Sequence, residues 1–322
     1  MTLHWQPTAP LPHLRLRADI LQQIRHFFKI RQVLEVETPL MCHTSVTDPF
    51  IQSIPALFQS HPNHDPTPYY LQTSPEFAMK RLLAAGSGSI FQLCKAFRQG
   101  EVGHLHNPEF TLLEWYRLGF SHHDLMNEMD ELLQLILHTE KADRITYADL
   151  FRTHLQIDAH QASLAALSTC ANQRQIAVAS TITDRDTWLN LLMTHCIEPV
   201  LGQDRPCFIY DFPASQAALA KLLPGDPRLA ARFEVYVKGI ELANGFHELQ
   251  DALEQRRRFE QNQHMRQEMG LPDIPIDQPF LAALAHGLPD CAGVALGIDR
   301  LIMLATGSEQ ISQVLSFDFS NS

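Results

Sequence analysis

Apolar residues recur at two different spacings along the chain, and the spacing predicts helices and strands. Residues 14–33 carry apolar positions three and four apart, the pattern of one buried helix face. Residues 90–97 and 109–118 instead predict two strands of a hairpin with a long tip rich in glycine and histidine. Ser121, followed three residues later by Asp124, predicts the capped start of another helix.

The second half of the chain predicts further strands. Residues 207–212 form one strand, and residues 232–238 and 240–249 form a hairpin that turns at a Lys-Gly pair. A strand over residues 292–298 leads directly into a helix over residues 299–305. Because hairpins joined by helices outnumber strand-helix-strand crossovers, we expect an α+β fold with an antiparallel sheet flanked by helices.

One long stretch departs from this pattern of paired strands. Residues 146–201 are helical in their spacing, polar, and poor in residues that suggest chemistry. We interpret them as a helical insertion within a single catalytic domain that spans residues 1–322.

Composition narrows the class of protein. The 322 residues include 45% hydrophobic and 19% charged side chains, which excludes a disordered or collagen-like chain. Apolar runs are too short for a membrane span and the first residues lack a secretory signal, so we expect a cytoplasmic protein with no membrane partner. The net charge of −11 argues mildly against a dedicated nucleic-acid binder.

Cysteines and histidines form no familiar disulfide or metal pattern. The six cysteines are scattered without a C-x-x-C pair, so we expect reduced thiols. Of the 17 histidines, the close pairs His61/His64 and His104/His106 lie among residues typical of solvated loops. We therefore favour loop residues over metal ligands for these histidines.

Charged residues interrupt the strands at places where a buried strand would be apolar. Arg98 ends one strand and Glu114 lies on its hairpin partner, while Arg300 directly follows a strand with small residues at alternate positions. The later hairpin carries the polar residues Glu234, Glu241, Asn244 and Glu248.

These residue types suit a phosphorylated ligand. The planar fork of arginine binds phosphate or carboxylate through two hydrogen bonds. Clustered glutamates suit Mg²⁺, which keeps positions open for water and phosphate. Each feature alone has a simpler explanation, such as a solvated edge charge or tight packing. Together, and in this order, they predict a site where a carboxylate attacks the α-phosphate of ATP.

Three segments, in order, resemble the three motifs of class II aminoacyl-tRNA synthetases. Residues 34–41 (LEVETPLM) resemble motif 1, residues 97–101 and 106–116 resemble motif 2, and residues 293–300 (GVALGIDR) resemble motif 3. The NPEFT run inside motif 2 and residues 241–249 (ELANGFHEL) look specifically like the lysyl branch. The likeness covers nearly the whole chain.

The resemblance implies roles for individual residues. Arg98 and Arg300 would be catalytic, holding the α- and γ-phosphates, while Glu234 and Glu241 would bind Mg²⁺. The residues implied to bind ATP are Arg98, Gln99, Gly100, Asn107, Glu241, Leu242, Gly297 and Arg300. Those implied to bind a lysine-like amino acid are Ser74, Pro75, Glu76, Glu114, Tyr116, Asn244, Glu248 and Ala295.

Departures from the synthetase pattern bear on the activity. Lysyl-tRNA synthetases carry an N-terminal OB-fold domain for the anticodon, whereas motif 1 here follows the first predicted helix, so we expect no such domain. Ala295 stands where those enzymes have the middle glycine of motif 3. The chain is thus similar to paralogous ligases of the lysyl branch. That likeness implies activation of (R)-β-lysine, or lysine, and its transfer to a lysine side chain of elongation factor P.

Another departure lies in motif 2. The family has a glutamate two residues after the motif 2 arginine, where this chain has Gly100 followed by Glu101. We expect Glu101 to take that role after a small shift of the loop.

Alternatives to this function stay open. One is a minimal lysyl-tRNA synthetase, or another adenylate-forming amide synthase such as an asparagine synthetase on this fold. Another is an inactive, regulatory subunit, against which the intact Arg98, Glu241 and Arg300 argue. Motif 1 implies a homodimer, and tRNA is the less favoured acceptor.

Overall fold

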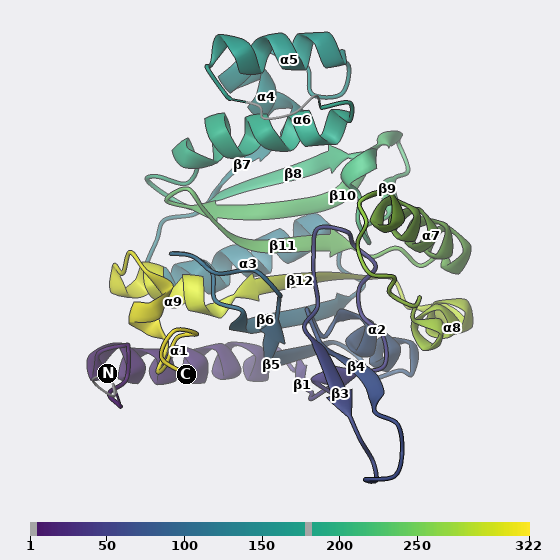
Figure 1. Ribbon diagram of the computed structural model, residues 1–322. Coiled ribbons are helices and arrows are strands. Elements are labelled where there is room, and N and C mark those ends of the chain that lie inside the picture. The colour runs from purple at the N-terminus through teal and green to yellow at the C-terminus, as the bar shows by residue number, and fades with distance from the viewer. Residues whose placement is uncertain (1–4, 178–181) are drawn as a thin grey trace. The chain divides into compact units, whose positions relative to one another are not determined.

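The computed structural model describes residues 5–177 and 182–322. The chain forms two compact units, each drawn from more than one stretch of sequence (Figure 1). The first contains Met1–Gly119, Gln250–Cys291 and Ala295–Ser322, and the second contains Phe120–Leu249 and Ala292–Val294. Among the described helices, none combines the length and hydropathy that crossing a membrane requires.

The first unit is built on the predicted hairpin. β5 (Ile90–Phe97) pairs antiparallel with β6 (Glu109–Leu118) along their whole lengths, and β1 (Leu34–Glu35) adds to β5 in parallel. A separate small sheet contains β2 (Met41–Cys42), β3 (Pro55–Phe58) and β4 (Thr67–Leu71). The bounds predicted for both hairpin strands are confirmed.

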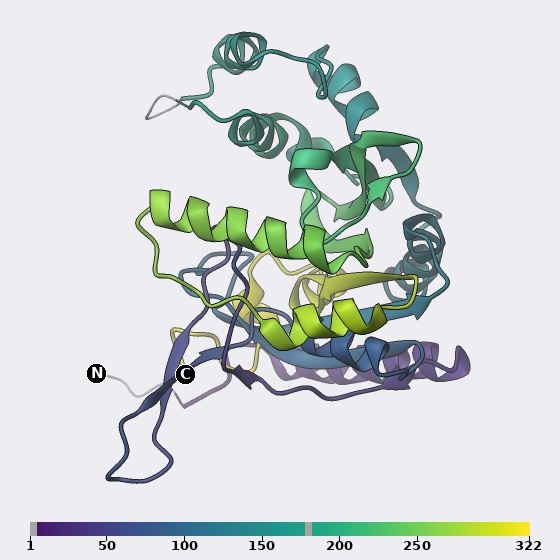
Figure 2. The ribbon, with the colours of Figure 1, turned by 90° about the vertical axis from the view of Figure 1, so that its right-hand side faces the viewer.

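Helices of the first unit pack on these strands and on each other. They are α1 (Leu11–Ile30), α2 (Glu76–Ala84), α7 (Ala252–Glu268), α8 (Gln278–Gly287) and α9 (Ile298–Thr306). Phe28 of α1 stacks on Phe91 of β5 with ring centroids 4.5 Å apart. Phe77 of α2 stacks on Phe280 of α8 at 4.6 Å, and α7 lies alongside α8 in both ribbon views (Figures 1 and 2). The sequence pattern did not predict α8.

The second unit holds the second predicted hairpin. β10 (Asp226–Val237) pairs antiparallel with β11 (Ile240–His247), with β8 (Cys207–Pro213) and with the short β9 (Leu222–Leu223). β7 (Asp143–Thr146) lies parallel to β8. The hairpin turns at Lys238 and Gly239, whose φ angles of 52° and 75° are those of a tight hairpin turn.

Helices of the second unit follow the predicted starts. α3 (His122–Leu137) begins with the expected capping box of Ser121 and Asp124. Helices make up much of residues 146–201, as predicted, and residues 178–181 lie outside the described chain. They contain α4 (Tyr147–Leu155), α5 (Leu164–Gln173), α6 (Arg185–Leu192) and the short turns Met193–Ile197 and Glu198–Val200. Their apolar faces share one core with β8.

β12 (Cys291–Gly297) runs through both units and leads into α9, as the sequence predicted. The expected α+β fold with its antiparallel strand pairs is confirmed, and two further pairs, β1 with β5 and β7 with β8, are parallel. A parallel pair needs a long crossover connection. Here α2 lies in one crossover and α4, α5 and α6 lie in the other.

A buried ion pair holds three elements of the first unit together. Asp299, at the start of α9, is 2% exposed and accepts hydrogen bonds from the Arg17 guanidinium of α1 at 2.6 Å and the Thr111 backbone N–H of β6 at 2.7 Å. Arg17 also donates to the Thr111 hydroxyl at 2.6 Å. The residue that follows Asp299 is Arg300, so this network positions the predicted catalytic arginine.

Arg17→Met should therefore destabilise the protein. Removing one partner of a buried pair costs about 3 kcal/mol, which corresponds to a loss of roughly 4 °C in Tm for a chain of this length. Arg25→Met on the same helix is the matched control, because the Arg25–Glu35 pair is exposed and such pairs contribute about 1 kcal/mol or less. Thermal unfolding of both variants checks this, and equal losses in the two would contradict the assigned role of Asp299.

Candidate active site

A buried carboxylate lies on the β5–β6 hairpin of the first unit. Glu114 of β6 is 2% exposed, and its two oxygens accept hydrogen bonds from the Ser74 hydroxyl at 2.7 Å and the Tyr116 hydroxyl at 2.6 Å. Glu114 and Tyr116 lie two residues apart on one strand, which puts them on the same face. The structure therefore brings together three of the residues predicted to bind the amino acid.

Two more predicted residues begin α2. Pro75 is the N-cap residue, and Ser74 accepts only a local bond, from the Glu76 N–H at 3.1 Å, because its own proton points to Glu114. Glu76 pairs with Lys80 one turn later at 2.6 Å, and Lys80 is 1% exposed.

The environment of Glu114 shifts its acid–base behaviour. Burial, and secondarily the nearby Glu76 carboxylate, raise the pKa of Glu114 to about 7. The hydrogen bonds from Tyr116 and Ser74 and the charge of Lys80 act in the opposite direction. The carboxyl group of Glu114 is therefore partly protonated near pH 7. A cation bound beside it would favour its ionised form.

Arg98 begins the loop that follows β5. Its guanidinium lies 3.6 Å from Glu101 and 5.0 Å from the centre of the Phe110 ring. Its Nε is buried and has no hydrogen-bond partner in the described part of the chain. This N–H is therefore a buried donor that an anionic ligand, if it reached the site, could satisfy.

The residues after Arg98 have their backbone held by neighbours. The backbone N–H of Gln99 donates to the Gln52 carbonyl at 2.8 Å. Gly100 has a left-handed φ of 82°, a conformation that favours glycine over the family's glutamate. That Glu101 takes the role of the family's glutamate stays a prediction.

Arg300 meets the tip of the same hairpin. Its guanidinium donates to the Leu105 carbonyl at 3.3 Å and lies 2.6 Å from the His106 Nε2. Burial, then the charge of Arg300, lower the pKa of His106, which leaves a neutral ring that can accept a hydrogen bond. Gly297 precedes α9 as its N-cap, and Ala295 is half-buried on β12.

Asn107 holds the loop rather than projecting freely from it. Its amide donates to the Glu109 carbonyl at 2.6 Å and accepts from the Phe319 N–H at 2.9 Å. This structural role was not predicted from the sequence. Contact between Asn107 and a nucleotide stays a prediction.

The second unit places the remaining predicted residues on or beside one hairpin. Glu234 is 8% exposed, and its carboxylate is held by the Arg232 guanidinium and by the Tyr236 hydroxyl at 2.8 Å. Arg232 also donates to the Asn244 side chain at 3.2 Å. Burial, then Glu234 and Glu241, raise the pKa of Tyr236 well above its ordinary value, so its hydroxyl stays a donor.

A β-bulge brings the other polar residues to the same face. Glu234 lies opposite Asn244 and Tyr236 opposite Glu241, with the register shifting between these pairs. Residues 241 and 244 would point to opposite faces of a regular strand, and the extra residue, the buried Leu242, removes that difference. Glu248 follows β11 and is 1% exposed, in a bridge to Ala220.

Lys80 and Arg232 form ion pairs with the predicted site residues Glu76 and Glu234, and sequence reasoning missed both. Both carried a usable signal. Lys80 lies four residues after Glu76 on a helix, and Arg232 lies two residues before Glu234 on a strand, and these spacings place the side chains on one face.

Comparison with known proteins gives one consistent result. A family model described as tRNA synthetases class II (D, K and N) matches residues 4–320. A protein of Vibrio parahaemolyticus named elongation factor P–(R)-β-lysine ligase is 54% identical over 99% of each chain. Proteins of the same name from Klebsiella pneumoniae and Vibrio cholerae are 53% and 54% identical over 98% of each chain. The chain therefore belongs to the class II tRNA synthetase family (D, K and N), together with these elongation factor P–(R)-β-lysine ligases.

Proposed function

We propose that the chain is an ATP-dependent ligase that activates (R)-β-lysine, or lysine, and transfers it to a lysine side chain of elongation factor P. The relatives that share more than half of its residues over nearly their whole length carry that name. The observation that carries the proposal is the buried Glu114 carboxylate, a group suited to a substrate with an ammonium.

The amino-acid pocket is proposed on Ser74, Glu114 and Tyr116. Two neutral hydroxyls orient the carboxylate, whose pKa near 7 lets an incoming ammonium displace its proton. Glu76, already paired with Lys80, adds negative charge beside it. A pocket of this kind selects a basic amino acid over a neutral or acidic one.

The chemistry follows from the two arginines. A carboxylate oxygen of the amino acid attacks the α-phosphorus of ATP, and pyrophosphate leaves as the aminoacyl adenylate forms. Arg98 and Arg300 would stabilise charge on the phosphoryl oxygens. In the second step a neutral lysine amine of elongation factor P attacks the acyl carbon, AMP leaves, the amine loses a proton and an amide bond remains.

Glu234 and Glu241 are proposed to bind Mg²⁺. Their carboxylate oxygens are the donors that Mg²⁺ takes, and they lie on paired strands facing one side. Mg²⁺ would take over the contact that Arg232 now makes with Glu234. When bound, the ion supplies positive charge to phosphate oxygens.

ATP–pyrophosphate exchange tests the first step. We expect exchange with (R)-β-lysine or lysine and none with aspartate, and we expect Arg98→Ala to abolish it because the variant lacks the guanidinium proposed to hold the α-phosphate. Labelled amino acid should then appear on elongation factor P and not on a factor whose acceptor lysine is replaced by arginine. Charging of tRNA without labelling of the factor, or no exchange with any of the three amino acids, would contradict the proposal.

Glu114 also predicts a pH dependence of substrate affinity. Below its pKa of about 7 the group is neutral, and above it the carboxylate attracts the substrate ammonium, which stays charged throughout. KM for the amino acid should therefore fall about tenfold between about pH 6 and about pH 8, following the ionised fraction. Initial rates of exchange across this range measure it.

Glu114→Gln should raise KM at the higher pH and flatten the profile, because the titrating group is gone. Glu268→Gln is the control, since Glu268 is an exposed carboxylate beside His264 on α7. A wild-type profile as flat as that of Glu114→Gln would rule out the proposed role of this carboxylate.

A further inference from the structure

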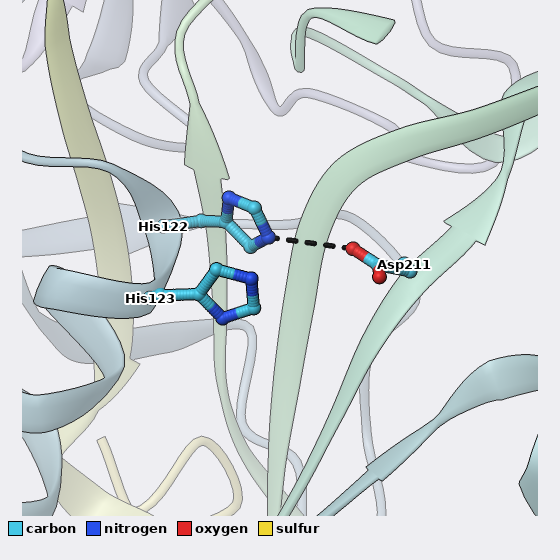
Figure 3. A group of neighbouring side chains, drawn as sticks. All are labelled: His122, His123 and Asp211. Carbon is cyan, nitrogen blue, oxygen red and sulfur yellow. Dashed lines mark ion pairs between the residues drawn. The ribbon is translucent and has the colours of Figure 1, made fainter. Parts of the chain in front are cut away.

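Three side chains that no proposed role uses converge in the second unit. His122 and His123 lie in the first turn of α3, and Asp211 lies in β8. Figure 3 shows the two rings pointing from the helix toward the carboxylate of the strand. One potential ligand atom from each lies within 4.8 Å of the other two.

Local backbone structure holds this arrangement. The capping box of Ser121 fixes the first turn of α3, and the two imidazole rings lie 4.0 Å apart. Asp211 has a left-handed φ of 60° at the point where the register of β8 with β10 shifts. Such irregularities redirect a side chain out of the regular alternation of a strand.

The buried atoms of this cluster are not satisfied by hydrogen bonds. The side chain of His122 is 4% exposed, yet neither of its ring nitrogens has a hydrogen-bond partner within residues 5–177 and 182–322. Asp211 Oδ1 also has none there. A buried polar atom left this way costs about 1–3 kcal/mol, so a ligand that pairs with it is favoured.

The spacing matches a metal ion better than a direct hydrogen bond. The ion pair between His122 Nε2 and Asp211 Oδ1 spans 3.4 Å (Figure 3), longer than the usual hydrogen bond of about 3 Å. Two ligands of a tetrahedral zinc ion, each about 2.1 Å from the metal, lie about 3.4 Å apart. His123 is exposed and its ring already faces the carboxylate, so a small adjustment of the ring would complete the set.

The donors indicate which ion would bind. Two imidazoles and one carboxylate suit Zn²⁺, whereas Mg²⁺ prefers oxygen ligands alone. Asp211 and the nearby Asp124 favour a cation, while Arg144 and the positive end of α3 oppose one. The set is therefore balanced in charge rather than strongly acidic.

We propose that His122, His123 and Asp211 form a zinc site that joins the start of α3 to β8, with water as the fourth ligand. The sequence did not indicate it, because the aspartate is distant along the chain and two adjacent histidines have no characteristic metal-site spacing.

Metal titration of the full chain, freed of metal by a chelator, tests the site. Co²⁺ is the probe, because a four-coordinate Co²⁺ ion absorbs visible light and the bands report its ligands. We expect one Co²⁺ per chain, displaced by Zn²⁺, and a higher Tm with Zn²⁺ than without it. Asp211→Asn and His123→Ala should each weaken Co²⁺ binding at least roughly tenfold. Even residues that only hydrogen-bond to a metal ligand change metal affinity by that factor when they are replaced.

His195→Ala is the matched control, because His195 is an exposed histidine of the same unit and should leave binding unchanged. Circular dichroism of each variant shows whether it is folded. Absence of a stoichiometric Co²⁺ complex overturns the proposal. So does binding that Asp211→Asn and His123→Ala leave unchanged, which would place the ion among the other histidines.

Discussion

The carboxylate of Glu114 is buried on strand β6, and its burial requires the polar groups that surround it. Moving a carboxylate out of water costs several kcal/mol unless partners compensate. Ser74 and Tyr116 give one hydrogen bond to each oxygen, and the remaining penalty is visible as a pKa raised to about 7. A site whose negative charge is only partly compensated suits a ligand that brings a positive one.

Other carboxylates predicted to bind ligands are already paired by cations of the chain itself. Glu76 pairs with Lys80, and Glu234 with Arg232. These pairs stabilise the charges in the free protein, so a Mg²⁺ ion at Glu234 must compete with a guanidinium. Glu114 differs because two neutral hydroxyls hold it, and this difference supports the proposal that it binds the substrate ammonium.

Local sequence patterns predicted much of the fold. They did not predict the β-bulge or the contacts between residues that are distant in the sequence. The bounds of β5 and β6 and the capping box of α3 followed from alternation and from a short-range signal. The bulge that puts Glu241 and Asn244 on one face could not be predicted, because strand periodicity assigns them to opposite faces. Tertiary packing placed Asp211 beside His122, and no spacing in the sequence records that contact.

Titration of Glu114 by NMR, in protein carrying ¹³C-labelled glutamate, tests the central claim most directly. Comparison with Glu114→Gln assigns its carboxyl signal. The account predicts a pKa near 7 in the free protein and a fall of at least about one unit when (R)-β-lysine or lysine is bound, because the ammonium stabilises the carboxylate. A pKa in the ordinary range of glutamate, or one that the amino acid does not move, would contradict it.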